Sequence, residues 1–233
     1  MRNGKKISAI IPVYNEEKTI ESILLTLISI DYIDEIVVIN DGSNDRTIDV
    51  LNKFSKYENV RIINHIQNMG KGYALYNGII NAEGDILIFL DADLIGLTKF
   101  HILKLVNPLI CDEADMVMGY APKDKELINL LNPFKSLTGE RALYKKDLFP
   151  IINIIKDSGY GVETIINKNY NKKRVKLINL EGLKHPIKTQ KVSNKKLCFI
   201  QFSKEAKEIF LTNVKLSIIK KLKNSKMNVG LER

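Results

Sequence analysis

The sequence predicts an α/β fold in which a mostly parallel central sheet carries helices on both faces. Apolar runs of strand length, such as residues 86–90, lack polar alternation and so fit strands buried on both faces. These runs alternate with stretches whose apolar residues recur at helical spacing, a pattern typical of parallel strands joined by right-handed helical crossovers. The length of 233 residues fits one such domain with a sizeable core.

The first half of the chain repeats strand and helix three times and then adds a fourth strand. The strands are predicted at residues 7–13, 35–40, 60–64 and 86–90. Asn15 has the side chain of an N-cap for a first helix that runs to about residue 28. The second and third helices are predicted at residues 46–55 and 73–81, each after a turn rich in glycine and polar residues.

The second half of the chain is less regular. Its helices are predicted at residues 99–110 and 147–156 and after Gly159-Tyr160-Gly161, and its strands at residues 116–120, 142–145 and 175–180. Residues 121–136 fit a loop with a helical piece, a candidate lid. Apolar residues return at helical spacing over 203–222. We divide the chain into a domain at residues 1–183 and a C-terminal extension at residues 184–233.

Four of the predicted strand ends carry polar residues, at 12–16, 40–43, 70–72 and 91–93. The carboxyl ends of parallel strands lie along one edge of a sheet, and ligands bind at that edge. Asp91 and Asp93 flank one small residue there, an arrangement that suits a divalent cation bridged to phosphates. The alternative is a solvated turn that merely ends a strand.

These motifs resemble the family 2-like glycosyltransferases, which have the single-domain, Rossmann-like GT-A fold. In the first half, the resemblance is to dolichol- and polyprenyl-phosphate sugar transferases, through residues 11–16, 41–47, 68–74, 84–85 and 91–94. In the second half, residues 137–142, 159–163 and 179–185 look more like glucosyl-3-phosphoglycerate synthases. The segment between Gly119 and Leu137 lacks the basic loop that holds phosphoglycerate in that family, so the acceptor stays open.

The resemblance implies a cation site and a nucleotide site. Asp93 would bind Mg²⁺ or Mn²⁺, Asp91 and Ala92 would touch the nucleotide, and Asp91 is a further candidate ligand. His185 would complete the site, and its imidazole suits Mn²⁺ better than Mg²⁺. Residues around the base, ribose and diphosphate would be Pro12, Val13, Tyr14, Asn15, Glu16, Asp41 and Lys71.

Each of these nucleotide contacts has a simpler alternative. Asn15 could be only an N-cap. Asp41, expected to accept a hydrogen bond from the base, could instead cap the second helix, as could Ser43 or Asn44. Lys71, expected at the diphosphate, could be a solvated lysine in a turn.

The acceptor side is predicted around Glu163. A carboxylate after the glycine-rich turn 159–161 could be a general base on the acceptor hydroxyl, could orient acceptor or sugar, or could simply favour the start of a helix. Gly139, Glu140 and Arg141 would line the acceptor, with Glu140 bound to sugar hydroxyls and Arg141 to a phosphate. The alternative for that pair is a plain salt bridge. His65 and His101 are interpreted as structural or surface residues.

The sequence therefore indicates a metal-dependent glycosyltransferase that moves a hexose from a UDP- or GDP-linked sugar to a lipid phosphate or small phosphorylated acceptor. Inversion and retention both remain open, because the two resemblances differ on this point. A sugar-nucleotide pyrophosphorylase would need an arginine-containing glycine-rich loop after the first strand, where this chain has Tyr14-Asn15-Glu16-Glu17. A non-catalytic nucleotide-sugar-binding module is the third possibility.

The net positive charge comes from the C-terminal extension, which holds 13 basic and 3 acidic side chains of a chain with net charge +9. Its amphipathic stretch could contact anionic lipid, pack on the domain or form a homodimer. No nucleic-acid partner is expected, because stacking aromatics are few.

Cys111 and Cys198 suggest a reduced compartment without disulfides or zinc. The early apolar run is too short for a signal peptide, and none reaches membrane-span length. We expect a cytoplasmic protein, with possible peripheral contact at the inner face of the membrane.

Overall fold

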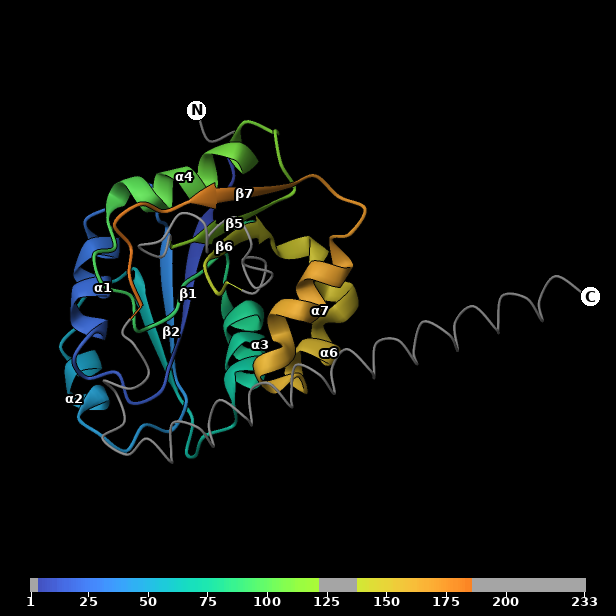
Figure 1. Cartoon of the computed structure of the whole chain (residues 1–233). Helices are drawn as coiled ribbons and strands as arrows, with labels where there is room; N and C mark the ends of the chain where they lie inside the picture. The colour runs from blue at the N-terminus through green and yellow to red at the C-terminus, as the bar shows by residue number, and fades with distance from the viewer. Residues whose placement is uncertain (1–3, 122–137, 186–233) are drawn as a thin grey trace, which may run out of the picture.

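A computed structural model describes residues 4–121 and 138–185, and these form one layered α/β unit (Figure 1). The strands are β1 (Ile7–Val13), β2 (Glu35–Asn40), β3 (Val60–Asn64), β4 (Ile86–Phe89), β5 (Met116–Tyr120), β6 (Arg141–Tyr144) and β7 (Val175–Asn179). The α-helices are α1 (Ile20–Ile28), α2 (Thr47–Asn52), α3 (Lys71–Asn81), α4 (Lys99–Ile110), α6 (Ile152–Lys156) and α7 (Val162–Asn169). Short 3₁₀ helices lie at Lys145–Asp147, Phe149–Ile151 and Gly159–Gly161.

The strands form a seven-stranded sheet in the order β3-β2-β1-β4-β6-β5-β7. β1 pairs in parallel with both β2 and β4, so its central residue Ile10 lies beside Val37 on one side and Phe89 on the other. β6 runs antiparallel to β4 and β5, and β7 returns to the parallel direction beside β5. The predicted fold class, a mostly parallel sheet between helices, is confirmed.

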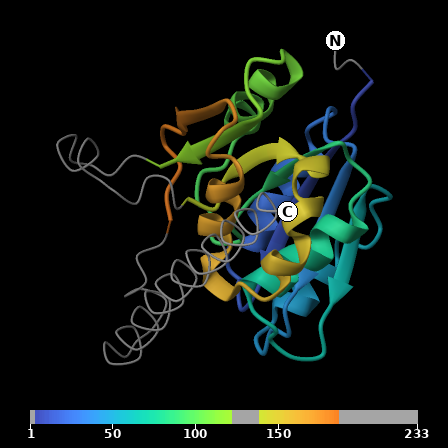
Figure 2. The same ribbon diagram turned by 90° about the vertical axis from the view of Figure 1, so that its right-hand side faces the viewer.

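Helices cover both faces of the sheet, and each face has its own core. Buried residues of α1, α2 and α4 pack on one face, and those of α3, α6 and α7 on the other (Figures 1 and 2). Alternate residues of β1 point to the two cores, with Ile11 in the first and Ile10 in the second. Gly78 of α3 has no room for a side chain, since an added Cβ would lie 2.4 Å from Ile10 Cγ2. The lack of a side chain at Gly78 therefore lets α3 pack closely against β1.

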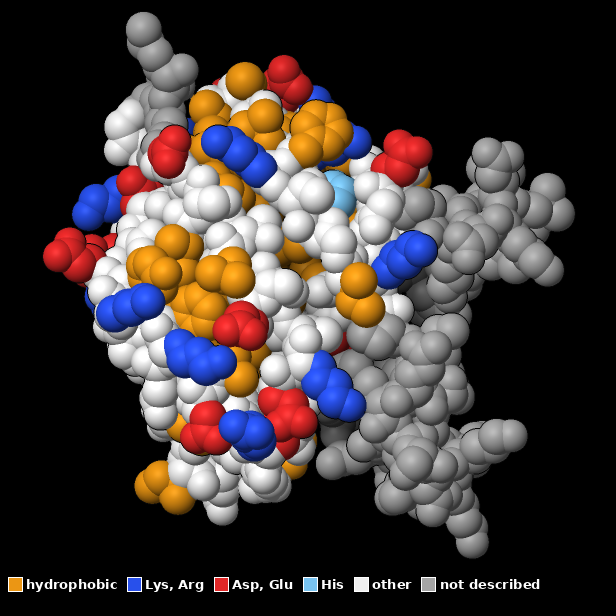
Figure 3. Space-filling model, turned by 90° about the vertical axis from the view of Figure 1, so that its left-hand side faces the viewer, with side chains coloured by type: hydrophobic (Ala, Val, Ile, Leu, Met, Phe, Trp, Pro, Cys, Tyr) orange, Lys and Arg blue, Asp and Glu red, His pale blue; other side chains and the backbone are white. Residues whose placement is uncertain are grey.

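The outer surface on the side of α1, α2 and α4 is mixed in character. Figure 3 shows acidic and basic side chains of both signs scattered among small apolar patches. Within the described residues, no helix is both long enough and apolar enough to span a bilayer.

Two predicted helix starts are wrong. α1 begins at Ile20, because Asn15 has φ +57° and its Oδ1 accepts a hydrogen bond from the Asn44 amide. Asn15 therefore links two loops and is not an N-cap. α6 begins at Ile152, and the residues before it form 3₁₀ turns around Pro150, which has no N–H for a helix interior.

The capping alternatives for the second helix are also wrong. α2 spans only Thr47–Asn52, and its N-cap, Arg46, makes no side-chain capping bond. None of Asp41, Ser43 and Asn44 therefore caps α2.

Several predictions concern residues outside the described ranges. The candidate lid, except Ala121, the amphipathic stretch at 203–222 and Cys198 all lie there. The division of the chain at residue 183 stays a prediction.

Candidate active site

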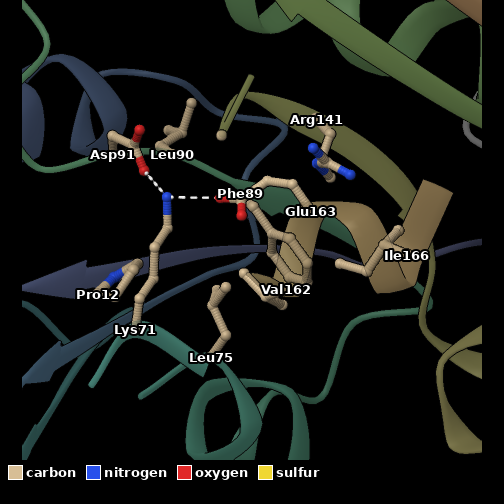
Figure 4. Close-up of a pocket in the computed structure, with 11 residues that line it drawn as sticks. Pro12, Lys71, Leu75, Phe89, Leu90, Asp91, Arg141, Val162, Glu163 and Ile166 are labelled. Atoms are coloured by element: carbon tan, nitrogen blue, oxygen red, sulfur yellow. Dashed lines mark hydrogen bonds and ion pairs between the residues drawn. The ribbon is translucent and has the colours of Figure 1, made fainter. Parts of the chain in front are cut away.

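Lys71 lies between two carboxylates at the carboxyl edge of the sheet. Its Nζ is 2.7 Å from Oδ1 of Asp91 and 2.8 Å from Oε1 of Glu163 (Figure 4). Burial opposes the charge on this ammonium, but the attraction of the two carboxylates outweighs it and raises the pKa of Lys71. Apolar side chains wall the pocket around the three charges: Pro12, Leu75, Phe89, Leu90, Val162 and Ile166. These walls leave 11% to 27% of the three charged side chains exposed, and the reduced solvation strengthens the ion pairs.

Close packing of α3 on the connection between α6 and α7 brings Glu163 to Lys71. Gly72 follows the lysine, and an added Cβ there would lie 2.4 Å from Ser158 Oγ and 2.6 Å from the Ile155 carbonyl oxygen. Glu163 stands in the first turn of α7, where a helix favours an acid, and only 8% of it is exposed. This carboxylate is thus a buried member of the site and more than a helix-start acid.

Asp91, Asp93 and His185 form a candidate cation site. One potential ligand atom from each lies within 4.8 Å of the others. Opposite ligands of a Mg²⁺ ion are roughly 4 Å apart, so small adjustments would let these three share one ion. Two carboxylates and an imidazole suit Mn²⁺ as well.

Two backbone hydrogen bonds bring His185 to this site from the far end of the described chain. The amides of Ile95 and Lys184 donate to each other's carbonyls at 2.9 and 3.0 Å. His185 Nδ1 then lies 3.3 Å from Asp93 Oδ1. Burial opposes the positive imidazolium, but the nearby carboxylates of Asp93 and Glu140 outweigh it and raise the pKa of His185 to about 10.

The predicted acceptor residues form the back of the site. Gly139 lies against Asp91 so closely that an added Cβ would be 2.5 Å from both carboxylate oxygens. Glu140 is fully buried, and its Oε1 lies 3.6 Å from His185 Nε2. Arg141 is 1% exposed and donates to Asn167 Oδ1 and the Thr138 carbonyl. Their contact with an acceptor stays a prediction.

Asp41 belongs to a buried cluster that sequence reasoning missed. Its Oδ1 lies 2.7 Å from His65 Nδ1 and accepts from the Met69 amide, while Oδ2 accepts from the Gly70 amide. Asn77 lies 2.7 Å from the other imidazole nitrogen. The cluster holds the loop that ends at Lys71. The position of His65, directly after β3 at the ligand-binding edge, was the available signal for a role beyond the surface.

His101, like His65, makes structural contacts, as interpreted. It forms a capping box with Thr98 at the start of α4, and its Nε2 lies 2.8 Å from the Glu181 carbonyl oxygen.

The remaining predicted nucleotide residues differ in what they can offer. Pro12 lines the pocket wall, Tyr14 is 42% exposed, and the Glu16 amide donates to Thr47 Oγ1. The side chains of Val13 and Ala92 are buried in the core, and the Ala92 carbonyl accepts from Thr19 Oγ1. Val13 and Ala92 could therefore reach a nucleotide only through their backbone.

The site as a whole combines a candidate cation site, a buried ammonium and a buried carboxylate along one edge. A cation and an ammonium can offset charge on an anionic leaving group, and a carboxylate can accept a proton or orient a hydroxyl.

Comparison with known proteins agrees with this arrangement. The sequence profile of glycosyl transferase family 2 matches residues 8–174, more than half of the chain. A dolichyl-phosphate beta-glucosyltransferase of Trichomonas vaginalis is 39% identical over 113 residues, which are 43% of this chain and 33% of that protein. A poly-beta-1,6-N-acetyl-D-glucosamine synthase of Staphylococcus epidermidis is 36% identical over 188 residues, 70% of this chain and 43% of that protein. The chain thus spans less than half the length of these curated relatives.

Similar solved structures include glucosyl-3-phosphoglycerate synthase from Mycobacterium tuberculosis. Its complex with Mn²⁺, UDP-glucose and phosphoglyceric acid has a TM-score of 0.64 and 26% identity, covering 80% of this chain and 73% of that one. Its complex with Mn²⁺, UDP-glucose and glycerol 3-phosphate has a TM-score of 0.70 and 25% identity, covering 92% and 80%. Both resemblances drawn from the sequence are confirmed, and so is the GT-A fold.

Proposed function

The chain belongs to glycosyl transferase family 2, and from this membership we propose that it transfers a hexose from a UDP- or GDP-linked sugar to a phosphate-bearing acceptor with the help of Mg²⁺ or Mn²⁺. One observation carries the proposal: the cluster of Asp91, Asp93 and His185 stands beside the Lys71–Glu163 pair at the carboxyl edge of the sheet. A donor with a diphosphate and an acceptor with a hydroxyl or phosphate need these two kinds of group side by side.

The cation site and Lys71 act on the donor. A bound Mg²⁺ or Mn²⁺, held by Asp93, Asp91 and His185, supplies positive charge against the departing nucleoside diphosphate. Lys71 adds a second positive charge, because its two carboxylate neighbours keep its amino group protonated. Asp41 and the loop at residues 12–16 lie at the same edge and are proposed to hold the nucleoside.

Glu163 acts on the acceptor. Its pairing with Lys71 holds the carboxylate at the edge of the sheet, where it can accept a proton from an attacking oxygen. As a base behind the anomeric carbon, Glu163 would give inversion. In a retaining reaction it would position donor and acceptor, with Gly139 and Arg141 on the acceptor side.

The names of two of the similar proteins support a phosphate-bearing acceptor. Dolichyl phosphate and phosphoglycerate, named for the relatives above, both carry a phosphate. UDP-glucose is the donor bound in the similar solved structures and is therefore the first donor to test. Contact of the basic C-terminal extension with anionic lipid would bring the site close to an acceptor that is a lipid phosphate.

A transfer assay tests the proposal. The full chain is incubated with Mn²⁺ and either UDP-glucose or GDP-mannose, and with either polyprenyl phosphate in vesicles or 3-phosphoglycerate. We expect glycosylated product with at least one pair, and none with Asp93→Ala. Pyrophosphate release from UTP and glucose 1-phosphate would favour a pyrophosphorylase instead. Tight binding of nucleotide sugar without transfer or hydrolysis would favour a non-catalytic module.

A further inference from the structure

The carboxylate of Glu140 is fully buried, and only one of its two oxygens makes a hydrogen bond within the described residues. Oε2 accepts a hydrogen bond from Thr138 Oγ1, but Oε1 makes no hydrogen bond within the described residues. A buried carboxylate oxygen without such a bond is costly unless a nearby charge compensates it. The group that Oε1 faces is the imidazole of His185, whose Nε2 lies 3.6 Å away.

The imidazole of His185 therefore stands between two carboxylates. Nδ1 lies 3.3 Å from Asp93 Oδ1, and Nε2 faces Glu140. When one ring nitrogen binds a cation, the other keeps its hydrogen and needs an acceptor. Histidines that bind metals commonly donate this second N–H to a carboxylate, which fixes the ring and makes the ligating nitrogen more basic.

We propose that Glu140 is a positioning residue of the cation site, an inference that rests on the proposed metal-dependent function. It accepts the Nε2–H of His185, so that the Nδ1 lone pair points to the cation shared with Asp93. Glu140 thus acts on the metal through His185 and does not itself touch the donor or the acceptor.

The backbone around Glu140 is held firmly enough for this role. Its carbonyl accepts the Gly119 amide at 2.8 Å, which ties the residue to β5. Gly139, with no side chain, lets the same segment lie directly against Asp91. One short stretch of chain thus supports two members of the cation site.

Burial and charge favour this role over a direct contact with an acceptor. Glu140 has no exposed surface, whereas 37% of the His185 side chain is exposed. The buried guanidinium of Arg141 interacts electrostatically with Glu140, Asp91 and Glu163 and so places a countercharge near the buried Glu140 carboxyl group.

Mn²⁺ titration without nucleotide tests the inference, with free Mn²⁺ followed by electron paramagnetic resonance. Glu140→Leu removes the acceptor and is expected to weaken Mn²⁺ binding by about 10- to 100-fold, with a weaker ¹⁴N coupling from His185 to the bound ion. Glu140→Gln keeps a neutral acceptor and should fall between Glu140→Leu and the wild type. Glu35→Gln is the matched control, because Glu35 is another largely buried carboxylate at the opposite edge of the sheet; it should bind Mn²⁺ normally.

A double-mutant cycle separates positioning from direct binding. If Glu140 acts through His185, adding Glu140→Leu to His185→Ala causes no further loss of Mn²⁺ affinity. An equal loss in both backgrounds would make Glu140 a ligand in its own right and overturn the positioning role. Wild-type affinity in Glu140→Leu, or in the isosteric Glu140→Gln if the leucine variant does not fold, together with unchanged ¹⁴N coupling would also overturn it. Failure of the wild type to bind Mn²⁺ would instead contradict the metal-dependent function.

Discussion

The ammonium of Lys71 lies 2.8 Å from Oε1 of Glu163, and this ion pair joins α3 to α7 across the carboxyl edge of the sheet. Asp91 at the end of β4 shares the same ammonium at 2.7 Å. Three elements that are distant in sequence therefore meet at one charge. The pair links the stability of the domain to the group proposed to act on the acceptor.

Lys71→Met should destabilise the fold by on the order of 3 kcal/mol, because it leaves two partly buried carboxylates without their countercharge. Urea unfolding measures this change in free energy. Lys53→Met is the matched control, since Lys53 pairs with Glu21 on the surface at 3.5 Å and should change stability by less than about 1 kcal/mol. Equal stability of the two variants would show that the Lys71 pairs do not stabilise the domain.

Glu163→Gln should lower kcat by about 10²- to 10⁴-fold if Glu163 is the general base, because the amide has nearly the same shape and cannot accept the proton. Donor affinity should stay within a few-fold, since Lys71 keeps its contact with Asp91. Steady-state kinetics and donor titration separate the two effects. Glu58→Gln, at an exposed position just before the amino end of β3, is the control. A fall in kcat of less than about tenfold would show that Glu163 positions the substrates and is not the general base.

Gly139→Ala should abolish turnover by displacing Asp91, because the new Cβ would lie 2.5 Å from both of its carboxylate oxygens. Mn²⁺ affinity should fall with it. Gly119→Ala is a useful comparison, since its Cβ would meet the Leu180 side chain and should lower the Tm while folded molecules keep their turnover. Normal turnover in Gly139→Ala would place the reaction away from Asp91.

Acid should weaken the interaction between Asp115 and Arg174, which joins the loops that precede β5 and β7. Arg174 donates side-chain and backbone hydrogen bonds to Asp115 and so lowers the pKa of that carboxyl below its ordinary 3.8. The folded pKa lies below the unfolded one, so this stabilisation is complete above pH 3.8 and is lost as pH falls through the lower folded value. The Tm difference between wild type and Asp115→Asn should therefore shrink in acid. A difference independent of pH would contradict this origin.

The strand pattern of the sequence predicted the sheet and the edge at which the acids gather, because the carboxyl ends of parallel strands meet there by topology. Asp91 and Asp93 follow β4 directly, so their place needed no other information. His185 could be assigned only by resemblance. Its approach to Asp93 depends on the backbone bonds between Ile95 and Lys184, which leave no local sequence signal.

Two other features lay beyond sequence reasoning for physical reasons. Asn15 has the side chain of an N-cap, yet its positive φ and its bond to Asn44 are set by the neighbouring loop. The cluster of Asp41, His65 and Asn77 joins side chains from three different segments, and only the packed structure brings them within hydrogen-bond distance.

This edge of the sheet is proposed to bind a nucleoside diphosphate through a divalent cation. Isothermal titration of UDP and of GDP, each with and without Mn²⁺, tests this binding in the full chain and in Asp93→Ala. We predict that one of the two nucleotides binds at least tenfold more tightly with Mn²⁺, and that Asp93→Ala keeps the fold but loses this gain. Absence of binding by either nucleotide, with or without Mn²⁺, would contradict the claim.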